Sequence, residues 1–185
     1  QNHVGFALTD LSGTVLNHTR QQNKFVFERQ YFNKLGELAI KFLEDSKITK
    51  QQFLGFGFSI PGIIDFRKDI IEFSHILGIT NVSCDTFSQF IPYNAVFTND
   101  ANAAIIAEMN NASKRSATVY LSLSNSVGGA IFTEVSNSQD DVQIIENLYI
   151  GESYRSGEFG HMTLVPGGRK CYCGKIGCMD SYCSA

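Results

Sequence analysis

The sequence has little positive charge and no long apolar run. Fifteen lysines and arginines stand against eighteen aspartates and glutamates, which gives a formal net charge of −3, and neither half is basic. Electrostatic binding of this chain to nucleic acid is therefore not expected. No apolar stretch is long enough to span a bilayer, and residues 1–20 lack a signal-peptide pattern. Internal repeats and low-complexity tracts are also absent, and 185 residues suffice for one domain or two small lobes.

The cysteines do not form the pattern of a disulfide framework. Three of the five lie in one short segment, which fits a reducing cytosol and predicts a cytoplasmic protein without membrane contact. Cys84 and Cys183 stand apart, and each is expected to be a small buried hydrophobe rather than a reactive group.

Residues 161–178 combine one imidazole and three thiols with four glycines. Zinc prefers a tetrahedral shell of nitrogen and sulfur donors, and glycines let a short loop turn tightly enough to bring such donors together. Four protein ligands leave no open position, so the pattern predicts a structural zinc rather than a catalytic one. The alternative is three free thiols in a mobile loop with the imidazole packed elsewhere. The predicted ligands are His161, Cys171, Cys173 and Cys178.

Strand-like and helix-like patterns alternate along the chain, which favours an α/β fold. A hairpin is expected around Asp10, and a second around residues 124–128. The predicted helices are 31–45 and 100–110, with a further helix starting at Met179. The predicted strands are 4–9, 14–19, 24–29, 53–60, 95–98, 119–123 and 129–134, and residues 136–141 are predicted to be a loop.

Asp100 follows a short strand and opens a helix rich in alanine. Capping and the helix dipole favour a carboxylate at that position for purely structural reasons. A carboxylate just beyond the carboxyl end of a strand is also where open α/β sheets place ligand-binding groups. In that second interpretation Asp100 is a general base or an acceptor for a substrate hydroxyl.

Two further segments have both a structural and a functional interpretation. Residues 59–62 (Ser-Ile-Pro-Gly), followed by Asp65, are either a strand-to-turn transition or one wall of a ligand cleft. Residues 123–129 (Leu-Ser-Asn-Ser-Val-Gly-Gly) are either a plain hairpin turn or a cradle of backbone N–H groups for phosphate oxygens. Both alternatives stay open for each segment.

Four motifs together resemble the ROK family of repressors, open-reading-frame proteins and sugar kinases. They occur in the family's order over essentially the whole chain, and the cysteine-rich loop is the most specific of them. They are the segments 59–62, 99–104 (Asn-Asp-Ala-Asn-Ala-Ala), 157–161 (Gly-Glu-Phe-Gly-His) and 171–178 (Cys-Tyr-Cys-Gly-Lys-Ile-Gly-Cys). The resemblance implies an actin-like, hexokinase-type ATPase fold of the ribonuclease H-like class, with two α/β lobes and a cleft between them.

The resemblance also assigns roles to single positions. Asn99 and Asp100 match residues that hold sugar hydroxyls, and in the kinases the aspartate is the catalytic base. Glu158 and His161 match further sugar contacts, with His161 also a zinc ligand, and Gly62 matches part of the sugar site. The family usually has glutamate two residues after the last zinc cysteine. Here Asp180 stands at that position, and its shorter side chain reaches less far.

Two departures concern the phosphate-binding segments of the kinases. The family's phosphate loop reads Asp-x-Gly-Gly-Thr, whereas residues 10–14 read Asp-Leu-Ser-Gly-Thr and better match the turn after it. The second segment usually reads Gly-Thr-Gly, but here it is Ser124-Asn125-Ser126. Asn125 places a Cβ where glycine allows close approach to phosphate. Both departures weaken ATP binding and leave the sugar positions intact, as in the family's transcription regulators.

The expected protein is therefore the sugar-sensing effector domain of a ROK-type regulator, not an enzyme. The alternative is a sugar kinase that uses ATP and Mg²⁺ with Asp100 as base, and a third possibility is an inactive interaction module held together by zinc. Lobes are expected at residues 1–98 and 99–185, the second incomplete at its C-terminal end. Expected partners are a monosaccharide or sugar phosphate and further copies of the chain as a dimer or tetramer. Contact with DNA would use a part of the protein upstream of Gln1.

Overall fold

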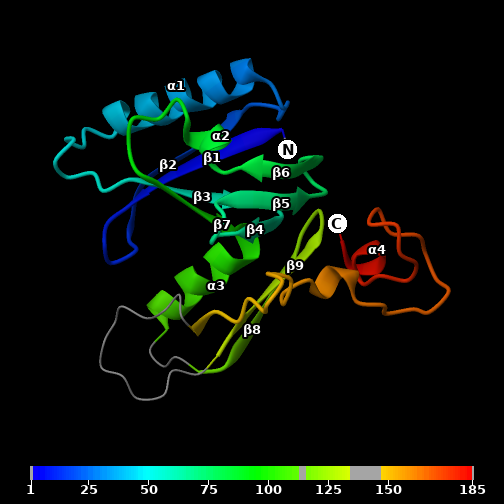
Figure 1. Ribbon diagram of the computed structural model, residues 1–185. Coiled ribbons are helices and arrows are strands. Elements are labelled where there is room, and N and C mark those ends of the chain that lie inside the picture. The colour runs from blue at the N-terminus through cyan, green and yellow to red at the C-terminus, as the bar shows by residue number, and fades with distance from the viewer. Residues whose placement is uncertain (1, 113–115, 134–146, 185) are drawn as a thin grey trace. The chain divides into compact units, whose positions relative to one another are not determined.

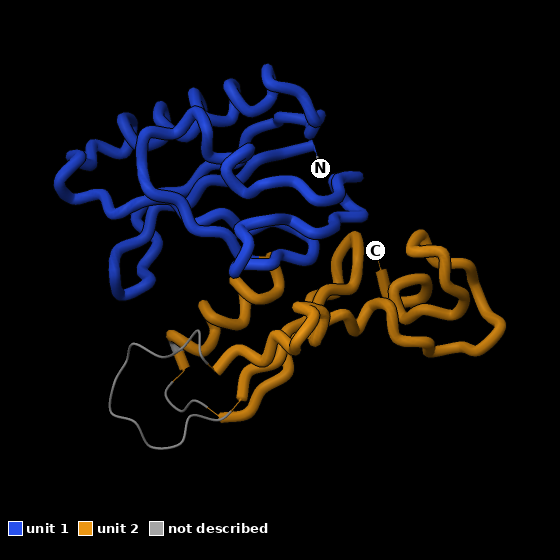
Figure 2. Tube along the Cα trace, in the orientation of Figure 1, with its two compact units in different colours: residues 1–98 blue, residues 99–185 orange. Residues whose placement is uncertain are grey.

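The structure is a computed structural model, and it describes residues 2–112, 116–133 and 147–184. The chain forms two compact units, Gln1–Thr98 and Asn99–Ala185, which are coloured separately in Figure 2. The predicted loop 136–141 and the last residue of the predicted strand 129–134 lie outside the described residues.

The first unit contains most of the strands (Figure 1). Strands β1 and β2 form an antiparallel hairpin, β3 is paired with β7, and β4, β5 and β6 form a three-stranded antiparallel sheet. The element bounds are β1 (His3–Thr9), β2 (Val15–Gln22), α1 (Arg29–Asp45), β3 (Phe56–Ile60), β4 (Ile63–Asp65), β5 (Ile70–Ser74), β6 (Ile79–Ser83), α2 (Asp85–Ser88) and β7 (Ala95–Asn99).

The turn between β1 and β2 is held by the side chain of Asp10. Its Oδ1 accepts hydrogen bonds from the backbone N–H groups of Ser12 and Thr14, both at 2.9 Å, and from the Ser12 hydroxyl at 2.6 Å. These bonds, that of the Ser12 hydroxyl first, lower the pKa of Asp10. The predicted hairpin is confirmed, and residues 10–14 serve as its turn.

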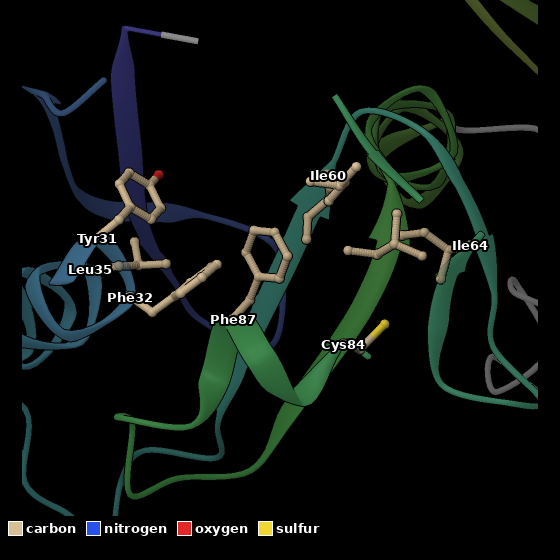
Figure 3. Close-up of a cluster of buried hydrophobic side chains, with 9 residues drawn as sticks. Tyr31, Phe32, Leu35, Ile60, Ile64, Cys84 and Phe87 are labelled. Carbon is tan, nitrogen blue, oxygen red and sulfur yellow. The ribbon is translucent and has the colours of Figure 1, made fainter. Parts of the chain in front are cut away.

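Helix α1 buries one face, as its periodicity predicts. Tyr31, Phe32, Leu35, Ala39, Phe42 and Leu43 recur three or four residues apart and are all buried. Figure 3 shows the first three of these close to Phe87 of α2 and Ile60 of β3 in one apolar cluster. The helix therefore covers the core of the first unit.

The predicted strand 24–29 is wrong. These residues form an irregular segment that leads into α1. Their alternation has another cause: Phe25 turns inward and its ring meets Tyr31 edge to face, with centroids 5.0 Å apart, and stacks near Phe87. The alternation of apolar and polar residues in this segment therefore reflects the inward position of Phe25 and not a strand.

The sheet β4–β6 was not predicted, and the predicted strand 53–60 is shorter, since β3 begins only at Phe56. Its first turn is built around Asp65, which is 2% exposed. The Asp65 carboxylate accepts the N–H groups of Arg67 and Lys68 at 3.0 and 3.1 Å and pairs with Lys68 Nζ at 2.8 Å. These contacts favour the turn interpretation of this aspartate.

The second unit packs a helix against a hairpin. Its elements are α3 (Asp100–Asn111), β8 (Thr118–Leu123), β9 (Val127–Phe132), the 3₁₀ helix η3 (Phe159–His161) and α4 (Asp180–Cys183). Helix α3 lies along β8 and β9 (Figure 1), and Ile105 and Phe132 are fully buried between them. The predicted helix 100–110 and the second predicted hairpin are confirmed. Within the described residues, no helix has both the length and the apolar composition needed to cross a bilayer.

Candidate functional site

Asn99 caps α3, and Asp100 is the first residue of the helix. The Asn99 Oδ1 accepts the N–H groups of Ala101 and Asn102 at 2.9 and 3.2 Å. The carboxylate of Asp100, which is exposed, accepts the Ala101 N–H at 3.0 Å. The Asn99 side chain therefore provides most of the N-terminal cap of α3, and the Asp100 carboxylate provides a smaller part. Besides the capping oxygen, Asn99 carries a donor group, Nδ2, and Asp100 carries a carboxylate.

Small residues bring the start of α3 close to β9. The Ala101 Cβ lies 3.6 Å from where a Cβ on Gly128 would stand, so the helix and the strand meet almost backbone to backbone. The alanines of the predicted helix thus allow close packing, as their size suggests. Asn99 and Asp100 are held beside the first residues of β9.

The segment that carries Glu158 and His161 packs against β9 as well, through glycines. A Cβ on Gly157 would run into the carbonyl oxygen of Gly129, and a Cβ on Gly160 into that of Val127. A Cβ on Gly128 would face Ala101 of α3, and a Cβ on Gly129 would meet the Phe159 ring of η3. Because neighbouring strand residues point to opposite faces, α3 and η3 lie on opposite faces of β9 near its first residues. The two predicted pairs of sugar-contacting residues are thus positioned by the same end of one strand.

His161, Cys171, Cys173 and Cys178 converge as the sequence predicts. Their ligand atoms all lie within 4.8 Å of one another, and two of the four residues are buried. The His161 Nδ1 is 3.7 Å from the Cys171 sulfur, and the Cys173 and Cys178 sulfurs are also 3.7 Å apart. Burial, followed by contacts with the other thiols, raises the pKa of Cys178 to about 11. These four residues could hold one metal ion.

The two nitrogens of His161 face different partners. While Nδ1 points to the thiols, Nε2 lies 4.0 Å from a carboxylate oxygen of Glu158. A metal on Nδ1 leaves the proton of a neutral imidazole on Nε2, where it can be donated. The side chains of His161 and Glu158 are 17% and 42% exposed, so this pair is accessible to a small ligand.

Asp180 and Tyr172 connect the cysteine-rich loop to β9. Asp180 Oδ2 accepts the Val127 N–H at 2.9 Å and the Tyr172 hydroxyl at 3.2 Å. Burial, followed by the charge and hydrogen bond of Asp180, raises the pKa of Tyr172 above its usual value, so the phenol keeps its proton. Tyr172 was not among the predicted site residues. Its place between two metal-ligand cysteines is the one sequence signal that singles it out.

The remaining predicted segments are explained by local structure. Gly62 lies in the first unit with φ of 141°, and a Cβ there would stand 2.9 Å from the Ser74 Cβ. Residues 124–126 form a tight turn in which the Ser124 N–H and hydroxyl both reach the Ser126 carbonyl at 3.3 Å. A hairpin turn therefore accounts for this segment. Of the two cysteines outside the cluster, Cys84 is buried as expected and Cys183 is only partly buried.

A comparison with protein families identifies the chain. The model of the ROK family matches residues 1–185. The chain belongs to the ROK family. The resemblance of the four motifs is thereby confirmed, and with it the actin-like, hexokinase-type ATPase fold.

Relatives within the ROK family include both regulators and enzymes. The chain is 28% identical to a xylose repressor of Bacillus spizizenii over 99% of its own length and 45% of the repressor. It is 30% identical to a glucokinase of Halalkalibacterium halodurans over 74% of its length and 39% of that enzyme. A solved ROK glucokinase of Streptomyces griseus, in complex with glucose and AMPPNP, matches 99% of the chain and 54% of that protein with a TM-score of 0.79 at 21% identity. The chain spans less than half the length of the two curated relatives.

Proposed function

We propose that this chain binds a monosaccharide or sugar phosphate in its second unit. The observation that carries the proposal is the pair Glu158 and His161. Their facing atoms are 4.0 Å apart, too far for a direct hydrogen bond, and a hydroxyl oxygen can lie about 2.8 Å from both. Such a hydroxyl would accept from Nε2–H and donate to the carboxylate. Asn99 and Asp100 carry a donor and an acceptor for further hydroxyls, and Gly62 stays a predicted sugar contact.

The ion that we propose for the four-residue cluster is zinc. In a tetrahedral zinc site, bonds of about 2.3 Å to sulfur and 2.0–2.1 Å to nitrogen separate two sulfurs by about 3.8 Å and a sulfur from a nitrogen by about 3.6 Å. The distances of 3.7 Å in the cluster agree with both values. Because protein atoms fill all four positions, the role of zinc would be structural: it would fix the ring of His161 with Nε2 towards Glu158.

Between the two kinds of ROK protein, we propose a transcriptional regulator. Backbone cradles for phosphate depend on glycines, which let oxygens approach N–H groups closely. The loop before β9 has Ser124, Asn125 and Ser126 instead, and its first residue bonds to its last. Similarity to a xylose repressor extends over 99% of the chain, against 74% for the glucokinase. The five cysteines form no disulfide, which supports the cytoplasm as the compartment.

Ligand screening of the intact protein tests this function. Thermal shift would be measured with xylose, glucose, their N-acetyl and 6-phosphate analogues where these exist, and ATP–Mg²⁺, with ADP release followed in the same wells. Stabilisation by one sugar without ADP release is expected, since a ligand that binds only the folded state raises its stability. Release of ADP that depends on the sugar would establish the kinase instead.

A substitution at Asp100 separates ligand binding from helix capping. Asp100→Asn keeps an oxygen that can accept the Ala101 N–H but removes the charge, so unfolding should change little. Charge-assisted hydrogen bonds contribute about 1.5–3 kcal/mol, so sugar affinity should fall at least about tenfold. Calorimetry measures the affinity, and an unchanged value would leave Asp100 with a structural role only.

A further inference from the structure

The position that the ROK resemblance assigns to a sugar-contacting glutamate is occupied here by a buried aspartate. Asp180 is 2% exposed, so its carboxylate has almost no surface to offer a ligand. Its Oδ2 accepts two hydrogen bonds from groups far apart in the sequence, the Val127 N–H and the Tyr172 hydroxyl. A buried carboxylate with two such donors is a fixed point in a structure.

The first donor belongs to the strand that positions the site. Val127 is the first residue of β9, and the carbonyl oxygen of the same residue lies against Gly160, one residue before His161. A displacement of the Val127 backbone would therefore move the segment that carries Glu158 and His161. The Asp180 hydrogen bond holds the N–H group of the same residue.

The second donor belongs to the cysteine-rich loop. Tyr172 stands between Cys171 and Cys173, and its ring meets the His161 ring edge to face with centroids 5.3 Å apart. The path from the cluster to β9 thus runs from the Tyr172 backbone through its hydroxyl and the Asp180 carboxylate to the Val127 N–H. It contains only two hydrogen bonds and is short.

We infer that Asp180 is a positioning residue that links the metal cluster to the start of β9 through Tyr172 and Val127, in place of a direct contact with sugar. The link deepens the proposed function, on which its sugar readout rests: a correctly bound metal holds the β9 end of the sugar site in place. Loss of either hydrogen bond loosens β9 without touching the metal ligands.

Hydrogen exchange of the Val127 amide tests the link in the intact, metal-loaded protein. Asp180→Asn weakens both bonds, and Tyr172→Phe removes one while keeping the ring. Tyr182→Phe is the matched control, since it removes a tyrosine hydroxyl of α4 that accepts the Arg169 N–H at 2.7 Å, a contact that does not involve β9. Exchange in α3, which belongs to the same unit, shows whether that unit remains folded in a variant, and exchange in α1 of the other unit shows whether the effect is local.

In Asp180→Asn the Val127 amide should exchange about tenfold faster while metal content stays at one per chain, a factor that corresponds to about 1.4 kcal/mol. Chelation of the metal should speed this amide strongly in the unaltered protein and much less in Tyr172→Phe. Sugar affinity should fall severalfold in both variants and stay unchanged in Tyr182→Phe. Exchange that is unaltered in both variants, or equally altered in the control, overturns the inference.

The sugar measurements distinguish this inference from the proposed function. Should no sugar bind while the exchange pattern is as expected, the link stands and the proposed function fails. Should Asp180→Asn alone weaken sugar binding while Tyr172→Phe does not, Asp180 is a direct sugar contact and the positioning role is wrong.

Discussion

Asn99 caps α3 and, in our proposal, also contacts the sugar, and a pair of substitutions can measure the two roles independently. Asn99→Ala removes both the oxygen that caps the helix and the nitrogen that we assign to the sugar. Asn99→Ser keeps an oxygen suited to the cap and removes only the nitrogen, because serine is about as good a cap as asparagine.

The size of the stability effect follows from the two capped N–H groups. After Asn99→Ala, the Ala101 N–H keeps the Asp100 carboxylate at 3.0 Å, and only the Asn102 N–H loses its acceptor. Replacing a cap by alanine costs about 0.5–2 kcal/mol in general, and with one of two donors still served the lower half of that range is expected, about 1 kcal/mol. For a chain of this size that lowers the melting temperature by about 2–4 °C. Asn99→Ser should change it by less than about 1 °C.

The sugar affinities of the two variants should not differ as their stabilities do. Both variants lose the same hydrogen bond to a neutral ligand, worth about 0.5–1.5 kcal/mol, so both should bind sugar about 3–10 times more weakly. Thermal unfolding followed by far-UV circular dichroism measures the melting temperatures, and titration calorimetry measures the sugar affinities. If Asn99→Ser is destabilised as much as Asn99→Ala, the capping argument is wrong. If neither variant loses affinity, Asn99 does not contact the sugar.

Three further outcomes are expected. Cys173→Ser should lose bound zinc after dialysis, measured by elemental analysis, while Cys183→Ser keeps one zinc per chain; equal zinc content in both would exclude the assigned ligand. Gly157→Ala should lower the free energy of unfolding by about 1–3 kcal/mol, because its Cβ meets a backbone carbonyl of β9, whereas Gly5→Ala has no atom within 4 Å and should change little. Cys84 should resist alkylation at pH 8 while Cys183 reacts, as read by mass spectrometry. Burial raises the pKa of Cys84 from 9.0 to about 11, so the stability that its neutral thiol contributes is complete below pH 9 and is lost as the pH rises towards 11.

Elements with a strong period in the sequence were the ones that could be predicted. Helix α1 and strand β8 each have apolar residues at the spacing of their own secondary structure. The sheet β4–β6 has strands of three to five residues, joined by turns that need positive φ at Asp69 and Gly78. In strands that short, adjacent isoleucines such as Ile63 and Ile64 break the alternation of apolar and polar residues. The sequence pattern therefore does not predict these strands.

In the candidate site, contacts between residues close in the sequence could be predicted, whereas contacts between distant residues could not. The convergence of His161, Cys171, Cys173 and Cys178 could be predicted because the four residues lie within eighteen positions at a spacing typical of metal ligands. The bond between Asp180 and Val127 joins residues 53 positions apart, and no spacing rule points to it. The resemblance to a family assigned Asp180 a role by position alone, whereas its burial and its two donors are properties of the folded chain.

The contact between Gly157 and Gly129 has a consequence for attempts to redesign the selectivity of the proposed sugar site. Side-chain contacts in a pocket can be redesigned by exchanging one rotamer or residue for another, but this contact consists of backbone on both sides and has no such alternatives. The distance of Glu158 and His161 from β9 is therefore fixed by the backbone and changes little with side-chain substitutions. A change in sugar selectivity would have to come from substitutions at positions that border the site. Gly157, Gly129 and the rest of β9 are best left unchanged.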